Sequence, residues 1–277
     1  MLGAGTMGHG IAQVAAAAGY GVVLRDVNAE ALARGVQAIE RNLAKGIQLG
    51  KITEQQRDEI LQRIRGATRI EEISGVDLVI EAAPENLELK QNLLRASESL
   101  LDNDGIFATN TSSLSIGEIA SVASRPENVV GMHFFNPVHV MKLVEVVTHG
   151  RDSRPAAERA VEFARQLGKE PIVVRDSPGF ASSRLGVVLG LEAMRMLEQD
   201  VASAEDIDKA MELGYNHPMG PLKLTDLVGL DVRLAIAEYL HATLGKPQYE
   251  PPKILKEKVK KGELGKKTGK GFYTWSD

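Results

Sequence analysis

Cysteine is absent from the 277-residue sequence. This absence excludes disulfide bonds, thiol nucleophiles and metal sites built on thiolate ligands. Because a chain without disulfides suits a reducing compartment, we expect a cytoplasmic location. We also expect no bound metal ion.

The sequence also has no long apolar run and no excess of positive charge. No stretch approaches the roughly 20 apolar residues that span a bilayer, and the first residues lack the basic flank and apolar core of a signal peptide. The formal net charge of -4 gives no electrostatic footprint for nucleic acid. We therefore expect neither a membrane nor a nucleic-acid partner.

The sequence does contain a glycine-rich turn near its start, Gly3-Ala-Gly-Thr-Met-Gly8, followed by an apolar helix from Ile11 to Ala18. Three glycines at this spacing between a strand and a helix form the phosphate-binding turn of dinucleotide folds. The first permits a tight turn, the second lets the backbone approach the phosphates, and the third lets the helix pack closely on the sheet. We predict that a dinucleotide contacts Gly3, Gly5, Thr6, Met7 and Gly8.

Asp26 ends the predicted second strand, 20–26, and follows Gly8 by eighteen residues. An acidic residue about 20 positions after the glycines accepts the ribose hydroxyl of NAD in such folds. Its carboxylate would repel a 2′-phosphate, so we expect NAD, and the adjacent Arg25 leaves NADP as the alternative. The other interpretation of Asp26 is a solvent-exposed strand end or a cap of the next helix.

Only Met1 and Leu2 precede the glycine turn, whereas a strand of about five residues usually feeds it. In the usual strand order that strand lies at the centre of the sheet. We therefore expect the first strand of the fold to be truncated in this chain. We hypothesise that about six further apolar residues upstream would complete it, raise the melting temperature and tighten dinucleotide binding.

Two domains are predicted from the order of the elements. Alternating strands and helices up to residue 176 predict a Rossmann-like, doubly wound and mostly parallel sheet, with a helical hairpin inserted at about 29–65. From residue 177 to 277 only helical periodicity is found, which predicts an all-helical C-terminal domain. The remaining strands are expected at 67–70, 76–82, 105–109, 129–134, 142–148 and 171–175, and the helices at 87–101, 115–123, 155–168, 180–199, 204–213, 221–243 and 252–261.

Polar clusters follow three predicted strands, at 81–86, 110–113 and 133–137. Pockets of doubly wound sheets open at the carboxyl ends of strands. A turn at Asn136-Pro137 would bring Glu145 back beside His133, and a carboxylate that fixes an imidazole makes it a tuned proton acceptor. We predict that His133 takes the proton in an alcohol oxidation. A packed strand-end histidine remains the alternative for His133, and His9 competes for the role of base.

Seven blocks of the sequence resemble the L-3-hydroxyacyl-CoA dehydrogenases, specifically the short bacterial 3-hydroxybutyryl-CoA type. These blocks are Gly3–Gly8, Ala108–Leu114, His133–Pro137, Met141–Val146, Asp176–Phe180, Pro218–Leu222 and Gly265–Tyr273. The resemblance implies a catalytic pair of His133 and Glu145, with Ser112 touching both cofactor and substrate. It also implies a homodimer formed through the C-terminal domain, which takes part in substrate binding, and cofactor contacts from Asp26, Glu85, Lys90, Ser112, Asn136 and Lys267.

The sequence departs from this family at two places. Ser183 stands where the family usually carries asparagine, so we assign it to the catalytic group although it lacks an amide donor. In the inserted hairpin Asn42 and Leu49 stand at the family's coenzyme A contacts. The coenzyme A contacts are therefore expected at Asn42, Lys45 and Lys51, together with Ser112, and the alternative for the two lysines is an ordinary exposed surface.

Together these features predict the reversible, NAD-dependent oxidation of (S)-3-hydroxyacyl-CoA to 3-ketoacyl-CoA in fatty-acid β-oxidation or related acyl-CoA metabolism. One alternative is a β-hydroxyacid dehydrogenase that acts on a free acid with a lysine base. Another is a catalytically weak module that binds NADH and signals through its dimer. Activity on a coenzyme A thioester, compared with the free acid, discriminates among the three.

Overall fold

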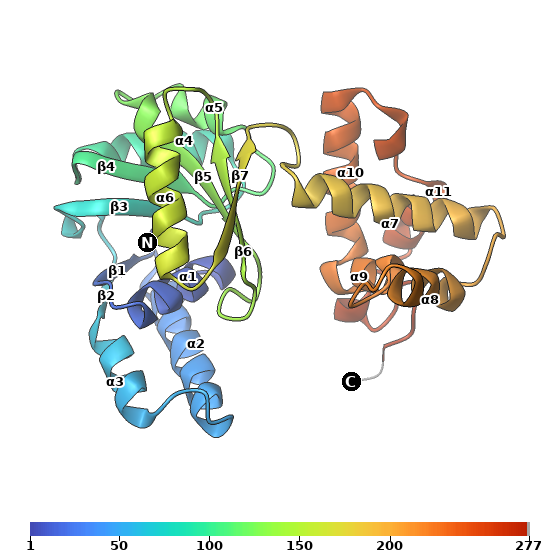
Figure 1. The fold of residues 1–277 in the computed structure, drawn as a ribbon, viewed down its shortest axis with the longest axis horizontal. Coiled ribbons are helices and arrows are strands. Elements are labelled where there is room, and N and C mark those ends of the chain that lie inside the picture. Colours follow the sequence, from blue (N-terminus) through green and yellow to red (C-terminus); the bar gives the residue numbers. More distant parts are fainter. Residues whose placement is uncertain (276–277) are drawn as a thin grey trace. The chain divides into compact units, whose positions relative to one another are not determined.

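The structure is a computed structural model that describes residues 1–275. It divides into two compact units, Met1–Ser177 and Pro178–Asp277 (Figure 1). None of the described helices is both long and apolar enough to cross a lipid bilayer. The first unit is built on a sheet and the second on helices, as the sequence predicts.

The sheet of the first unit is mostly parallel. Strands β3 to β7 follow one another in spatial order, and all neighbouring pairs are parallel except β5 and β6. Strands β1 and β2 form a separate parallel pair. The strands are β1 (Val22–Arg25), β2 (Ile64–Ala67), β3 (Val76–Glu81), β4 (Leu101–Thr109), β5 (Val129–Phe134), β6 (Leu143–Thr148) and β7 (Glu170–Arg175).

The first residues of the chain join the two parts of this sheet. Leu2 forms isolated bridges to Arg25 at the end of β1 and to Glu81 at the end of β3. Its N–H donates to the carbonyl of Ile80 at 2.8 Å, and its side chain is buried. The segment before the glycine turn therefore pairs with both β1 and β3 through Leu2.

Helices cover the sheet of the first unit. Buried residues of α1 and α6 join one apolar cluster with β4, β5 and β6, and α6 crosses in front of the strands in Figure 1. The inserted hairpin, α2 and α3, packs on α1, and Thr53 and Gln56 form a capping box at the start of α3. The helices are α1 (Thr6–Ala17), α2 (Ala29–Gln48), α3 (Glu54–Gln62), α4 (Leu87–Glu98), α5 (Ile116–Ala120) and α6 (Arg154–Gln166).

The second unit consists of helices around one apolar cluster. They are α7 (Ser182–Glu198), α8 (Ala204–Gly214), α9 (Pro221–Val228), α10 (Leu230–Leu244) and α11 (Lys253–Lys260). The single helix expected at 221–243 is wrong, because Gly229 has φ +102° and ends α9 before α10 begins. The strand expected at 67–70 is also misplaced, since β2 ends at Ala67 and Ile70–Glu72 form a 3-10 turn.

Candidate active site

His133 and Glu145 face each other across the antiparallel pair of β5 and β6. The imidazole Nδ1 and the carboxylate Oε2 lie 2.8 Å apart, and the two residues are only 6% and 0% exposed. A carboxylate accepts but cannot donate, so Nδ1 carries the proton and Nε2 is left as an acceptor. The pairing register thus prepares His133 to take a proton at Nε2.

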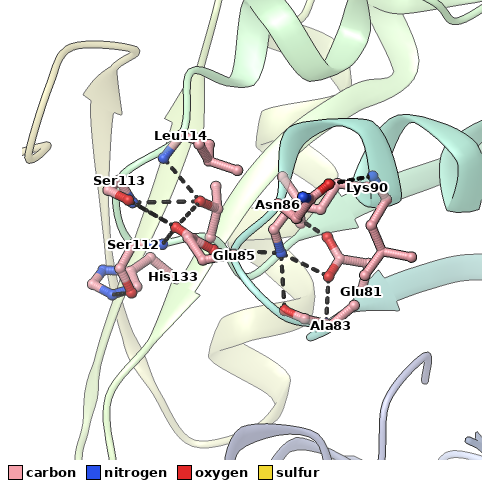
Figure 2. Close-up of polar contacts among 12 residues, drawn as sticks. Glu81, Ala83, Glu85, Asn86, Lys90, Ser112, Ser113, Leu114 and His133 are labelled. Atoms are coloured by element: carbon pink, nitrogen blue, oxygen red, sulfur yellow. Dashed lines mark hydrogen bonds and ion pairs between the residues drawn. The ribbon is translucent and has the colours of Figure 1, made fainter.

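Ser112 lies on the other side of the imidazole. Its hydroxyl oxygen is 3.1 Å from Nε2 of His133, and it belongs to the loop that follows β4. Figure 2 shows this loop gathered around the carboxylate of Glu85. Glu85 Oε1 accepts from the backbone N–H groups of Ser112 and Ser113, both at 3.0 Å, and from the hydroxyl of Thr111. Glu85 therefore fixes the loop that presents Ser112.

Glu85 stays ionised in this position. Burial raises the pKa of its carboxyl group, but the hydrogen bond from Thr111, the charge of Lys90 and the hydrogen bonds from Ser113 outweigh that effect. The pKa of Glu85 consequently lies below its usual value. The loop is held by a charge-assisted network rather than by neutral hydrogen bonds.

A buried ion pair lies behind Glu85. Lys90 of α4 and Glu81 of β3 are 1% and 0% exposed, and their Nζ and Oε1 atoms are 2.7 Å apart. Glu81 also accepts from the hydroxyl of Thr109, and Lys90 Nζ lies 3.6 Å from Glu85 Oε2. These partners enclose the ammonium of Lys90, so Lys90 acts on the site through Glu85. A direct contact between Lys90 and the cofactor stays a prediction. The sequence analysis placed Glu81 in a polar cluster but gave it no role, because a strand-end acid gives no local signal of burial.

The glycine turn leaves its backbone open to a ligand. A Cβ atom at Gly3, whose φ is +93°, would lie 2.7 Å from the carbonyl oxygen of Ala82, and one at Gly8 would lie 1.9 Å from that of Gly3. At Gly5, by contrast, no atom lies within 4 Å of the Cβ position. Gly5 caps α1 without a side-chain hydrogen bond. The free N–H groups of the first turn, at Thr6 and Met7, thus form an anion-binding end.

Asp26 stands at the edge of this turn. Its Oδ2 accepts from the N–H of Ala4 at 2.9 Å, and its Oδ1 accepts from the N–H of Asn28 at 3.2 Å. Asn28, rather than Asp26, caps helix α2. The carboxylate is therefore anchored beside the glycines, and its role as the ribose acceptor stays a prediction.

Lys169 holds the loop between β5 and β6, which carries the exposed Asn136. It is 9% exposed, and its Nζ donates to the carbonyls of Val138 and Met141, the latter at 2.9 Å. Val138 in turn packs against Gly10 of α1, where a Cβ would lie 2.9 Å away. Burial lowers the pKa of the Lys169 ammonium. Sequence reasoning missed this lysine, because its acceptors lie about thirty residues away in the chain.

Several positive charges act on His139 of this loop. The pKa of His139 is lowered by burial and by the charges of Lys169, His9, Lys45 and Lys51. The lysines predicted to hold coenzyme A are therefore electrostatic neighbours of the loop, and both are exposed. Asn42, by contrast, donates its amide to the side chain of Gln13 at 3.1 Å.

Two of the predicted site residues lie in the second unit. Ser183 is in the first turn of α7, and Lys267 forms an ion pair with both carboxylate oxygens of Asp231, at 2.5 and 2.7 Å. The structure thus brings His133, Glu145, Ser112, Glu85 and Lys90 together in the first unit, while Ser183 and Lys267 stay predictions.

Comparison with known proteins covers the whole described chain. Residues 1–177 match the family described as 3-hydroxyacyl-CoA dehydrogenase, NAD binding domain, and residues 179–275 match 3-hydroxyacyl-CoA dehydrogenase, C-terminal domain. The chain is 44% identical over 275 residues to a probable 3-hydroxybutyryl-CoA dehydrogenase of Bacillus subtilis, covering 99% of this chain and 96% of that protein. It is 41% identical to a 3-hydroxyadipyl-CoA dehydrogenase of Escherichia coli, covering 99% of this chain and 58% of that protein. The crystal structure of (S)-3-hydroxybutyryl-CoA dehydrogenase from Ralstonia eutropha has a TM-score of 0.95 and 42% identity, covering 100% of this chain and 98% of that one.

Proposed function

Because the chain belongs to the 3-hydroxyacyl-CoA dehydrogenase family, we propose how its residues oxidise (S)-3-hydroxyacyl-CoA to 3-ketoacyl-CoA. It is an NAD-dependent dehydrogenase. The observation that carries the mechanism is the buried contact between His133 Nδ1 and Glu145, which leaves Nε2 beside the hydroxyl of Ser112. A general base must lie within hydrogen-bond reach of the proton it takes, and Nε2 meets that condition for a hydroxyl held by Ser112.

The chain's own groups handle the proton. The substrate hydroxyl donates to Nε2 of His133, and the buried carboxylate of Glu145 stabilises the imidazolium that forms. Ser112 orients the reacting oxygen, and Glu85 holds Ser112. NAD, when bound, supplies the acceptor for the hydrogen that leaves the substrate carbon with its electron pair. In the reverse direction the imidazolium returns its proton to the ketone oxygen.

The open glycine turn supports NAD as the cofactor. Its free N–H groups and the unfilled space at Gly5 fit a pyrophosphate. The carboxylate of Asp26 at the edge of the turn favours a free ribose hydroxyl over a phosphate. We therefore propose NAD rather than NADP.

The acyl-CoA thioester is the proposed substrate. The charges of Lys45 and Lys51 contribute to the lowered pKa of His139, and positive charges at this place suit the phosphates of coenzyme A. The relatives named above act, by their names, on a 3-hydroxybutyryl and a 3-hydroxyadipyl group, which differ in length and in the carboxylate at the far end. The proposed setting is cytoplasmic acyl-CoA metabolism, including β-oxidation.

Substitution of the base tests this mechanism. We expect His133→Gln to lower kcat for acetoacetyl-CoA reduction by about 10²- to 10⁴-fold, the usual contribution of general acid–base catalysis. NADH binding, followed by fluorescence, should stay nearly unchanged. Turnover of the thioester but not of free acetoacetate by the unaltered enzyme would support the substrate class, and retained turnover by the variant would place the base elsewhere.

A further inference from the structure

A polar cavity of about 320 Å³ lies within the first unit and shares no residue with the candidate active site. Its lining includes Thr148, which ends β6, Arg154, which begins α6, and Arg175, which ends β7. Every residue of the lining precedes Pro178, so the cavity belongs to one unit. Pockets of roughly 300 to 1,000 Å³ hold small molecules in proteins, so this cavity is large enough for a small ligand.

Three arginines of the lining have no counter-charge. None of the side chains of Arg151, Arg154 and Arg175 forms an ion pair or a hydrogen bond with another of the described residues 1–275. All three are exposed, and they come from three different segments that meet at the cavity. Positive charges that share a cavity repel one another, and an anion bound among them would remove that repulsion.

Asp176, the acidic residue of the lining, has other partners. Its Oδ2 accepts from the hydroxyl of Ser115 at 2.7 Å and from the N–H of Gly117 at 2.9 Å. His149 is also engaged, because its Nε2 lies 3.0 Å from the carbonyl oxygen of Pro126. The carboxylate of Asp176 therefore fixes the start of α5, and the guanidinium groups of the cavity remain available to a ligand.

The charge of the whole chain favours a small ligand over a polymer. The formal net charge is -4, so a long polyanion such as nucleic acid is repelled by the rest of the surface. A small anion responds mainly to charges within a Debye length, about 8 Å at physiological salt. Helix α6 adds to the local field, because Ser153 donates its hydroxyl to the carbonyl of Gly150 and its side chain does not cap the helix.

We propose that this cavity is a second anion site, which binds a small molecule that carries a phosphate group. A guanidinium group binds phosphate oxygens with two parallel hydrogen bonds, and Arg151, Arg154 and Arg175 supply three such groups. Thr148 follows Glu145 by three positions on β6, a span of roughly 10 Å. The ligand therefore lies beyond hydrogen-bond reach of the catalytic pair, and its binding does not depend on the proposed function.

Calorimetric titration of the NADH-saturated protein tests the proposal, since NADH fills the phosphate-binding turn at the glycines. Inorganic phosphate and glycerol 3-phosphate are the two probes, each added at constant ionic strength set with chloride. We expect one site per chain with a Kd below about 1 mM. A Kd at least about tenfold lower for glycerol 3-phosphate, a difference of about 1.4 kcal/mol, would identify a phosphate ester as the ligand. Equal or tighter binding of inorganic phosphate would identify the free ion, and either result supports the site.

Arginine variants locate the bound anion. Arg175→Gln should raise the Kd by about 10- to 10²-fold, the usual value of a hydrogen bond to a charged group, and Arg175→Lys should restore part of the affinity. The matched control is Arg165→Gln, which removes an exposed arginine near the other end of α6, roughly 16 Å along the helix from Arg154. This distance exceeds the Debye length, so the control should change the Kd by less than about twofold.

Three results would overturn the proposal. The first is no binding of either probe up to about 10 mM. The second is an unchanged Kd in Arg175→Gln, which would place the anion elsewhere. The third is an equal loss of affinity in Arg165→Gln and Arg175→Gln, which would show a general effect of charge. The melting temperature of each ligand-free variant is measured alongside, so that a change in Kd is interpreted only for variants that fold as the unaltered protein does.

Discussion

Glu85 shows how one carboxylate organises several backbone groups. It accepts hydrogen bonds from Thr111, Ser112 and Ser113, and it faces the ammonium of Lys90. Because its pKa is lowered in the folded protein, ionised Glu85 stabilises the fold above the carboxyl pKa of the unfolded chain. That stabilisation is lost as the pH falls through the lower, folded pKa.

Glu85→Gln is therefore expected to destabilise the protein at neutral pH but not in acid. At pH 7 the variant should lose about 1 to 3 kcal/mol in the free energy of unfolding, since a charged acceptor is replaced by a neutral one. The difference from the unaltered protein should narrow below about pH 4, where the carboxylate becomes protonated. Urea unfolding at several pH values measures the free energy of unfolding of the variant and of the unaltered protein. Asp77→Asn, at an exposed position of β3, is the control. A difference in that free energy that stays constant from pH 7 to pH 3 would contradict the stabilising role of ionised Glu85.

The contact between His133 and Glu145 was predictable from the sequence, whereas the residues that support the neighbouring loops were not. His133 and Glu145 are twelve positions apart and flank a proline turn, so hairpin geometry alone brings them together. Glu81, Lys90 and Lys169 carry charge, and charged side chains are normally exposed. Their burial depends on partners from other elements, which no local pattern reveals.

Among the elements, the loop between β5 and β6 contacts helix α1, which follows the glycine turn. Lys169, just before β7, donates to two of the loop's carbonyl groups, and Val138 of the loop packs against Gly10 of α1. The loop carries Asn136, for which a cofactor contact is proposed. Its position is thus set by a lysine that lies outside the loop.

Lys169→Met should leave two carbonyl groups without their donor. Each such group costs about 1 to 3 kcal/mol, and we expect a fall of that size in the free energy of unfolding. The KM for NADH should rise severalfold while kcat changes little, because the loop moves and His133 does not. Lys142→Met is the matched control, since this lysine of the same loop forms only an exposed ion pair with Glu170. Identical behaviour of the two variants in stability and KM would rule out the anchoring role.

The observed bounds of the elements agree with the predicted ones where the apolar pattern is regular. They differ where the backbone turns at a single residue or where strand pairing sets the bounds. The strand β5 has six buried positions in succession and was predicted at its observed bounds. The sequence analysis missed the break at Gly229, because the apolar periodicity continues across it. It also misplaced β2, because the position of that strand depends on its pairing with β1. Periodicity reports which face is buried, but not where the backbone turns.

Across the whole molecule, exposed apolar side chains are concentrated in the second unit. Nine of the sixteen exposed large hydrophobic residues found among the described positions belong to it, although it is the smaller unit. A protein interface between two copies would bury such side chains. We therefore expect the homodimer implied by the family resemblance to form through the C-terminal unit.

Sedimentation equilibrium should therefore give twice the chain mass at micromolar concentration. The double variant Leu224→Glu/Leu227→Glu places two charges on the exposed side of α9, where both leucines are about two-fifths exposed. We expect it to shift the equilibrium toward the monomer by at least tenfold in dissociation constant. The control Leu49→Glu, in the first unit, should leave the dissociation constant of the dimer unchanged. A single-chain mass for the unaltered protein at all concentrations would refute the dimer.

The joint between Ser177 and Pro178 lies after the last strand of the sheet. His133, Glu145 and Ser112, which are proposed to handle the proton, lie before it, whereas Ser183 and Lys267 lie after it. Recombination at this joint would therefore keep the proposed acid–base pair of one parent, so that hybrids of related chains would inherit their pH profile from that parent.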